Sequence, residues 1–201
     1  MPLCAEPAAA RRNRRRVREI YLASFPREER MPFFLMCLLA KMPQTQFLAF
    51  REGEQVCGFA YMAVLDGMAF LLFLAVDPAL RSRGYGSAIL REIAALYPSC
   101  KRLVSIERCD APADNAAQRL RRRQFYLRNG YAQTGYLVEL SDQKQEILLQ
   151  NGEVAVSAQG RYLKMSIEKI TDGDGSLRAN MQLYPDKDDP AYFDLPNKEE
   201  K

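Results

Sequence analysis

Residues Phe70–Leu96 read FLLFLAVDPALRSRGYGSAILREIAAL. An apolar run, Phe70–Val76, is followed by a proline turn and then by a loop rich in arginine and glycine, Arg81–Ser87. Apolar residues then recur at spacings of three and four, which predicts a helix over residues 86–97. A helix that starts at a glycine loop favours an anion, because its first N–H groups are unpaired and its dipole is positive there. We therefore predict a phosphate or pyrophosphate site at this loop.

Of three known phosphate-binding patterns, one matches the loop fully. The chain contains no run of the P-loop type, which ends in Gly-Lys-Ser/Thr. A dinucleotide fingerprint would need a third glycine where Ile89 stands. The pattern Arg/Gln-x-x-Gly-x-Gly/Ala is matched by Arg81, Gly84 and Gly86. The alternative is an arginine-rich surface turn that caps an ordinary helix.

With Leu74–Pro78 before it, the loop resembles the acetyl-CoA site of the GNAT family of N-acetyltransferases. The resemblance covers about residues 17–140 and implies acetyl-CoA as a co-substrate. Backbone N–H groups of Leu74–Val76 would bond the pantetheine arm, and one of them would steady the tetrahedral oxyanion. The residues implied to hold the coenzyme are Leu74, Ala75, Val76, Arg81, Ser82, Arg83, Gly84, Tyr85, Gly86 and Ser87.

The order of predicted elements indicates an α/β fold with a mixed, mostly antiparallel sheet and helices on both faces. Helices are predicted from about residue 11 to 24, 33 to 41, 86 to 97 and 115 to 129. Strands are predicted over 46–51, 55–64, 69–76, 103–107 and 131–140, with weaker candidates at 146–149 and 162–167. The strand at 103–107 should run parallel to 70–76 across the helical crossover. The resemblance implies that this parallel pair is splayed. The continuous apolar run 70–76 predicts burial on both faces.

Composition changes along the chain and predicts three regions. Residues 1–16 read as a flexible basic segment, of which the first ten residues should be frayed. Residues 17–167 form the predicted N-acetyltransferase domain. Residues 168–201 are acidic, poor in leucine and valine, and predicted to be disordered.

Charge and residue usage exclude several kinds of site. The net charge is +4, and the positive charge of the body suits a polyanionic ligand such as coenzyme A. The chain has no histidine, which removes Ser/His and Cys/His catalysis and most metal sites. Its five cysteines include no C-x-x-C pair, so neither a zinc site nor a disulfide framework is predicted. We expect no metal.

The predicted location is the cytoplasm, with no membrane partner. No secretory signal follows Arg11–Arg16, and the apolar segment Met31–Ala40 is too short to span a bilayer. An odd number of cysteines fits free thiols in a reducing compartment.

A second resembling segment is Arg123–Tyr131, which ends in Phe-Tyr, three residues and Gly-Tyr. In the GNAT family the tyrosine at this position lies near the coenzyme sulfur and acts as general acid, which implies that role for Tyr126. A phenol there can protonate the departing thiolate. The alternative is a core tyrosine beside Phe125. Many members carry an asparagine seven residues before the tyrosine; here that position is Arg119, so that contact is not carried over.

Glu107 is the first candidate for the general base. It closes the strand 103–107, and ligands gather at the carboxyl ends of such strands. A carboxylate there could take the proton that an ammonium group must lose before attack. The alternative is a surface glutamate paired with Arg102 or Arg108. Asp110 and the pair Glu28-Glu29 are weaker candidates.

The sequence as a whole predicts transfer of an acetyl group from acetyl-CoA to a primary amine, of a small molecule, by direct attack. The segment Phe25–Arg30 lies where the family lines its acceptor side, and its mixed charges do not identify the amine. A protein N-terminal acetyltransferase and a non-catalytic acyl-CoA-binding module are the alternatives. Nucleic acid binding through Arg11–Arg16 and Arg119–Arg123 is the less favoured reading, and a homodimer is left open.

Overall fold

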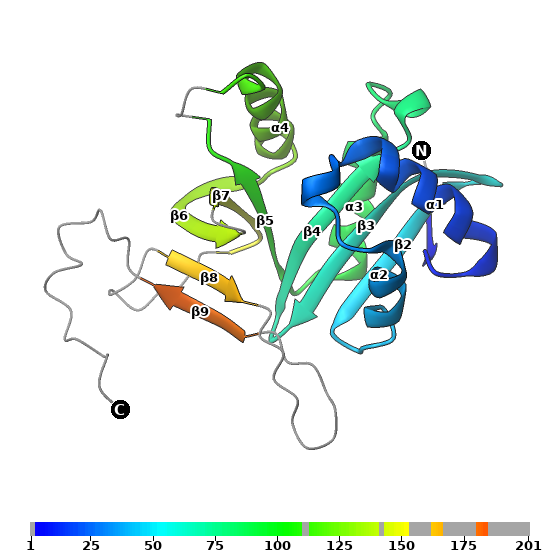
Figure 1. Cartoon of the computed structure of the whole chain (residues 1–201), viewed down its shortest axis with the longest axis horizontal. Coiled ribbons are helices and arrows are strands. Elements are labelled where there is room, and N and C mark those ends of the chain that lie inside the picture. Colours follow the sequence, from blue (N-terminus) through cyan, green and yellow to red (C-terminus); the bar gives the residue numbers. More distant parts are fainter. Residues whose placement is uncertain (1–2, 110–112, 141–142, 153–161, 167–179, 185–201) are drawn as a thin grey trace, which may run out of the picture. The chain divides into compact units, whose positions relative to one another are not determined.

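The computed structural model describes residues 3–109, 113–140, 143–152, 162–166 and 180–184. The chain divides into two compact units, residues 1–104 and 105–201 (Figure 1). The helices are α1 (Arg11–Ser24), α2 (Phe33–Leu39), α3 (Tyr85–Leu96) and α4 (Ala116–Arg128), with short 3₁₀ helices η1 (Arg27–Glu29) and η2 (Pro78–Leu80). The strands are β1 (Cys4–Pro7), β2 (Thr45–Glu52), β3 (Gln55–Leu65), β4 (Met68–Val76), β5 (Lys101–Glu107), β6 (Ala132–Leu140), β7 (Gln143–Gln150), β8 (Tyr162–Ser166) and β9 (Asn180–Tyr184).

In the first unit, β1, β2, β3 and β4 pair antiparallel in that order. Strand β5 joins β4 in parallel, with Met68 opposite Lys101 and Leu71 opposite Val104. The mixed sheet, its helical flanks and the parallel crossover are confirmed. Strand β1 was not predicted: residues 4–7 pair with β2, where the sequence suggested a frayed start. The helix predicted from about residue 11 to 24 is confirmed as α1, so residues 11–16, which were also assigned to a flexible basic segment, are helical.

In the second unit, β6 pairs antiparallel with β7 and parallel with β8, and β8 pairs antiparallel with β9. Strand β9 lies inside the acidic tail 168–201, for which the sequence predicts disorder. The rest of the tail lies outside the described residues.

Helices cover both faces of the first unit's sheet. Neighbouring residues of β3 point to opposite faces, so one packs against α1 and the next against α3. Phe59 packs edge-on against Tyr21 of α1, with ring centroids 6.0 Å apart. Gly58 faces α3 on the other side, where an added Cβ would lie 2.7 Å from Ile89 Cδ1 and 2.5 Å from the Ala75 carbonyl oxygen. Glycine at this position therefore allows α3 to approach the sheet closely.

Aromatic side chains fill the layer beneath α1 and α2. The linked rings are Tyr21, Phe25, Phe33, Phe47, Phe59, Tyr61 and Phe73. They bring β2, β3 and β4 together with both helices in one core cluster. The prediction that the whole run 70–76 is buried is wrong, because Leu72, Phe73, Leu74 and Val76 are only partly covered.

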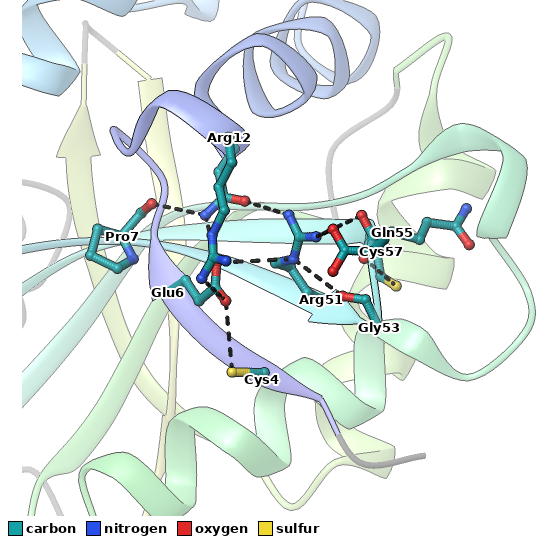
Figure 2. Close-up of polar contacts among 10 residues, drawn as sticks. Cys4, Glu6, Pro7, Arg12, Arg51, Gly53, Gln55 and Cys57 are labelled. Atoms are coloured by element: carbon teal, nitrogen blue, oxygen red, sulfur yellow. Dashed lines mark hydrogen bonds and ion pairs between the residues drawn. The ribbon is translucent and has the colours of Figure 1, made fainter.

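A buried guanidinium fixes the start of the chain to the β2–β3 turn (Figure 2). Arg51, whose side chain is 5% exposed, donates to Asn13 Oδ1 at 2.8 Å and to the Glu54 carbonyl at 2.7 Å. Asn13 in turn donates to Glu6 of β1 at 3.0 Å. Because each buried polar group has a partner, this network can hold β1 and α1 against the sheet without an unpaired charge.

Candidate functional site

The predicted pyrophosphate loop ends at the first turn of α3. Gly84 is the N-cap and has φ 85°, a left-handed conformation that glycine adopts without strain. The first α-helical bond runs from the Ala88 N–H to the Gly84 carbonyl at 3.0 Å. The N–H groups of Tyr85, Gly86 and Ser87 therefore have no acceptor inside the helix.

The first turn of α3 itself supplies no group that would compete with an anion. The N-cap offers no side-chain acceptor, and the first turn carries no acidic residue. Arg81 and Arg83 are exposed beside it. Within the described part of the chain Arg83 has no partner, whereas Arg81 donates to Ser24 Oγ at 3.0 Å. The loop thus combines free N–H donors with one uncommitted guanidinium.

Two carboxylates anchor the loop from either end. Asp77, 1% exposed, accepts from the Ala79 N–H at 3.0 Å and from Nε and Nη2 of Arg16 at 3.1 and 2.5 Å. At the other end, the Tyr85 hydroxyl donates to Glu52 Oε2 at 2.5 Å. The hydrogen bond to Glu52, reinforced by burial, raises the pKa of Tyr85 to about 12. Arg16 and Glu52 could not be predicted from local pattern, because they lie 61 and 33 positions along the chain from their partners.

Strand β4 contains an additional residue where it approaches the loop. Phe73 is opposite Tyr61 and Leu71 is opposite Met62, so Leu72 has no partner in β3 and forms a β-bulge. Beyond it, the Asp77 N–H bonds to the Cys57 carbonyl at 2.8 Å. Since bonding sides alternate along an antiparallel pair, the N–H groups of Leu74 and Val76 point away from β3. Ala75, between them, faces β3. Leu74 and Val76 lie past the segment of β4 that pairs with β5.

Glu107, the predicted base, is bound by groups of α4. Its Oε1 accepts from Asn115 Nδ2 at 3.1 Å and lies 3.4 Å from Arg119 Nε. Its Oε2 forms a very short ion pair with Arg122 Nη1. The alternative reading named Arg102 or Arg108 as partners; instead, Arg102 donates to the Tyr97 and Cys100 carbonyls. Both oxygens of Glu107 are therefore occupied.

Tyr126, the predicted acid, lies on α4 one helical turn after Arg122. It is 6% exposed and packs between Phe125 and Tyr131, with ring centroids 5.1 and 5.3 Å away. Burial raises the pKa of Tyr126, the nearby Tyr131 adds to the rise, and the Arg122 guanidinium opposes it. Among the described residues, its hydroxyl has no hydrogen-bond partner, so its proton is not committed to a structural contact.

The segment predicted to line the acceptor side forms η1 and its flanks. Arg30 is used structurally, because it donates to the Phe25 carbonyl at 2.6 Å and the Leu22 carbonyl at 2.8 Å. Arg27 is exposed. Glu29 belongs to the same turn, and Asp110, another candidate base, lies outside the described residues.

Metal ligands and membrane spans are not found in the described ranges. No group of three His, Cys, Asp or Glu side chains gathers there in a way that could hold a metal ion. Among the helices described, none is long and apolar enough to cross a bilayer.

Comparison with known proteins defines the class. A family model described as acetyltransferase (GNAT) domain matches residues 43–133, which run from β2 through the pyrophosphate loop to the start of β6. Together with the fold, this match identifies residues 43–133 as a GNAT acetyltransferase domain, as the sequence resemblance implied. No curated protein matches the chain in sequence.

Solved structures share the fold at low sequence identity. A protein assigned to the GNAT acetyltransferases from Bacteroides thetaiotaomicron is 18% identical, with 77% of this chain and 89% of that one covered and a TM-score of 0.64. An aminoglycoside 6′-N-acetyltransferase complexed with coenzyme A is 13% identical, with 75% and 96% covered and a TM-score of 0.59. A ribosomal-protein-alanine N-acetyltransferase from Escherichia coli is 14% identical, with 78% and 99% covered and a TM-score of 0.52.

Proposed function

We propose that this GNAT acetyltransferase moves an acetyl group from acetyl-CoA to the primary amine of a small molecule. The observation that carries the proposal is the start of α3, where the N–H groups of residues 85–87 have no helical acceptor and Arg83 has no partner within the described residues. A pyrophosphate fits such a site, since it satisfies several N–H donors and two positive charges at once.

The coenzyme would be held along β4 and the loop that follows. In this proposal the pyrophosphate lies on residues 82–87, with Arg81 and Arg83 beside it. The N–H groups of Leu74 and Val76 bond the pantetheine arm or the thioester oxygen, which their direction away from β3 supports. A coenzyme-A-bound structure of similar fold supports the same donor.

The chemistry requires no covalent intermediate on the enzyme. The free amine attacks the thioester carbon, a C–N bond forms, and the oxyanion is stabilised by backbone N–H groups. The C–S bond then breaks, and the sulfur takes the phenolic proton of Tyr126. The proton that the nitrogen loses returns through water to the Tyr126 phenolate, so that the enzyme is regenerated.

The acceptor class is inferred from segment 25–30 and from similar structures. Similar structures include one named for an aminoglycoside and one named for a ribosomal-protein alanine. The mixed charges of residues 25–30 suit a small amine or zwitterion, so we place the small molecule first and a protein N-terminus second. All five cysteines are free, which fits the reducing environment of the cytoplasm.

Calorimetry with coenzyme A followed by a thiol-release assay tests the proposal. We expect binding that weakens at least about tenfold in an Arg81→Gln, Arg83→Gln double variant, because two charge-assisted contacts are lost. Spermidine, an aminoglycoside and an alanine-terminated peptide serve as amine probes with acetyl-CoA. Coenzyme binding without thiol release from any primary amine would favour the non-catalytic module, and no binding of coenzyme A would sink the proposal.

A further inference from the structure

The helix α4 presents one continuous polar face to the end of β5. Asn115, Arg119, Arg122 and Tyr126 are spaced by four, three and four residues, which places them on the same side of a helix. The first three contact Glu107. Arg119 also donates to the Arg108 carbonyl at 3.2 Å and to Asn115 Oδ1 at 2.7 Å. The Glu107 carboxylate therefore contacts three side chains on the same helix face as Tyr126.

The environment of Glu107 is unfavourable for a general base. Its side chain is 15% exposed, and both oxygens are engaged by guanidinium or amide donors. A carboxylate that accepts an ammonium proton must first release such a contact. The same contacts suit a residue that fixes other groups in place.

We propose that Glu107 is a positioning residue: it holds Arg119 and Arg122 against the end of β5, and thereby orients the face of α4 that presents Tyr126. This assignment rests on the proposed acid role of Tyr126 for its catalytic consequence, although the anchoring itself does not. Arg122 lies one helical turn before Tyr126, so a fixed guanidinium stands near the phenol when its proton leaves.

Charge near the phenol supports this role. Proton donation by Tyr126 leaves a phenolate, which a neighbouring cation stabilises. The groups acting on the phenol are Arg122 on α4 and Tyr131 after it, and only the guanidinium favours the charged form. Those facing Glu107 are Asn115, Arg119 and Arg122. If the guanidinium swings free, the phenol loses its one favourable charge.

Hydrogen exchange tests the anchoring without any acceptor. In Glu107→Gln we expect the amides of α4 to exchange about tenfold faster than in wild type. The charge-swapped double variant Glu107→Arg, Arg122→Glu should recover most of the protection. Arg128→Gln, on the last turn of the same helix, is the matched control and should leave exchange unchanged. Unaltered α4 exchange in Glu107→Gln overturns the proposal.

Kinetics with acetyl-CoA and the best amine probe separates positioning from base catalysis. A positioning role predicts that Glu107→Gln and Arg122→Gln each lower kcat about tenfold at every pH, with KM for acetyl-CoA within about twofold. If Glu107 is instead the general base, the kcat of Glu107→Gln should fall near neutral pH and recover above the pKa of the amine. That result also overturns the proposal. If Tyr126→Phe is fully active while α4 exchange still rises in Glu107→Gln, the acid role fails and the anchoring stands.

Discussion

The Arg16 guanidinium donates from Nε and Nη2 to a single carboxylate oxygen of Asp77, at 3.1 and 2.5 Å. The Asp77 side chain is 2% exposed and its other oxygen caps η2, whereas Arg16 is 46% exposed. Both oxygens of this carboxylate, which precedes the proposed pyrophosphate loop, are thus bound, one by α1 and the other by η2. This contact connects the first helix of the chain with the proposed coenzyme site.

Removing the charge of Asp77 should therefore affect both stability and coenzyme binding. Asp77→Asn removes the buried charge that the Arg16 guanidinium contacts and leaves it paired only with the exposed Glu19, and we expect a loss of about 1–3 kcal/mol in the free energy of unfolding. Urea titration measures that loss, and calorimetry should show a several-fold higher Kd for coenzyme A. The control is Arg15→Gln, at a side chain 92% exposed and paired only with Glu19, which should change stability by less than about 0.5 kcal/mol. Equal effects of the two substitutions would contradict this account.

Gly84 and Gly53 offer a matched pair for the coenzyme loop. Both have positive φ, 85° and 56°, and an added Cβ at either would meet no atom within 4 Å. Alanine at either position should cost about 1–2 kcal/mol of stability through backbone strain alone. Only Gly84→Ala should weaken coenzyme A binding beyond that, since it alters the loop whose N–H groups face the anion. A comparable loss of affinity in Gly53→Ala would mean that the effect is general destabilisation.

The Tyr85–Glu52 hydrogen bond predicts a specific loss of stability at alkaline pH. The pKa of Tyr85 is raised from about 10 to about 12, so the folded state keeps the phenolic proton longer than the unfolded chain. The contribution of this hydrogen bond to the free energy of unfolding is complete below pH 10 and is lost as the pH rises toward 12. Tyr85→Phe should therefore flatten the fall in unfolding free energy between pH 10 and 12. Glu52→Gln should flatten it similarly, and an unchanged slope in both would show that the bond is not the cause.

Replacing Tyr126 by phenylalanine tests the general acid directly. Positioned acids contribute about 10²–10⁴-fold, so kcat for thiol release should fall within that range while the Kd for coenzyme A stays within about twofold. Stability should change by less than about 0.5 kcal/mol, because the hydroxyl has no partner among the described residues. Tyr131→Phe, at the ring 5.3 Å away, should retain kcat. Full activity of Tyr126→Phe would remove its catalytic role.

Much of the architecture could be predicted from local pattern. The turn at Glu52-Gly53-Glu54, the apolar run of β4 and the periodicity after Gly84 each lie within a few residues of the structure they specify. Element boundaries agree within a few residues for α1, α3, β2, β3 and β6. Strand β1 was not predictable in this way, because CAEP has no alternating pattern and becomes a strand only by pairing with β2.

The candidate site was predictable only in part, for the same reason. Arg81, Gly84 and Tyr126 belong to short patterns that stand together in the chain. The residues that hold this site in place lie far away in the chain. Ser24 contacts Arg81, Glu52 contacts Tyr85, and Glu107 contacts the face of α4 that carries Tyr126. Any of the many acidic and hydroxyl side chains could have filled these roles.

The sequence by itself determined the strand–loop–helix unit and the positive charge beside it, since φ at glycine, helix periodicity and charge are properties of neighbouring residues. It also determined that histidine chemistry is excluded. Only the tertiary structure decided that Leu72 bulges from β4, that Asp77 is bound by Arg16, and that both oxygens of Glu107 are taken by α4. These three features depend on strand register and on contacts between residues far apart in the chain. Which residues meet is determined by loop-closure entropy and by the packing of whole elements, not by local sequence.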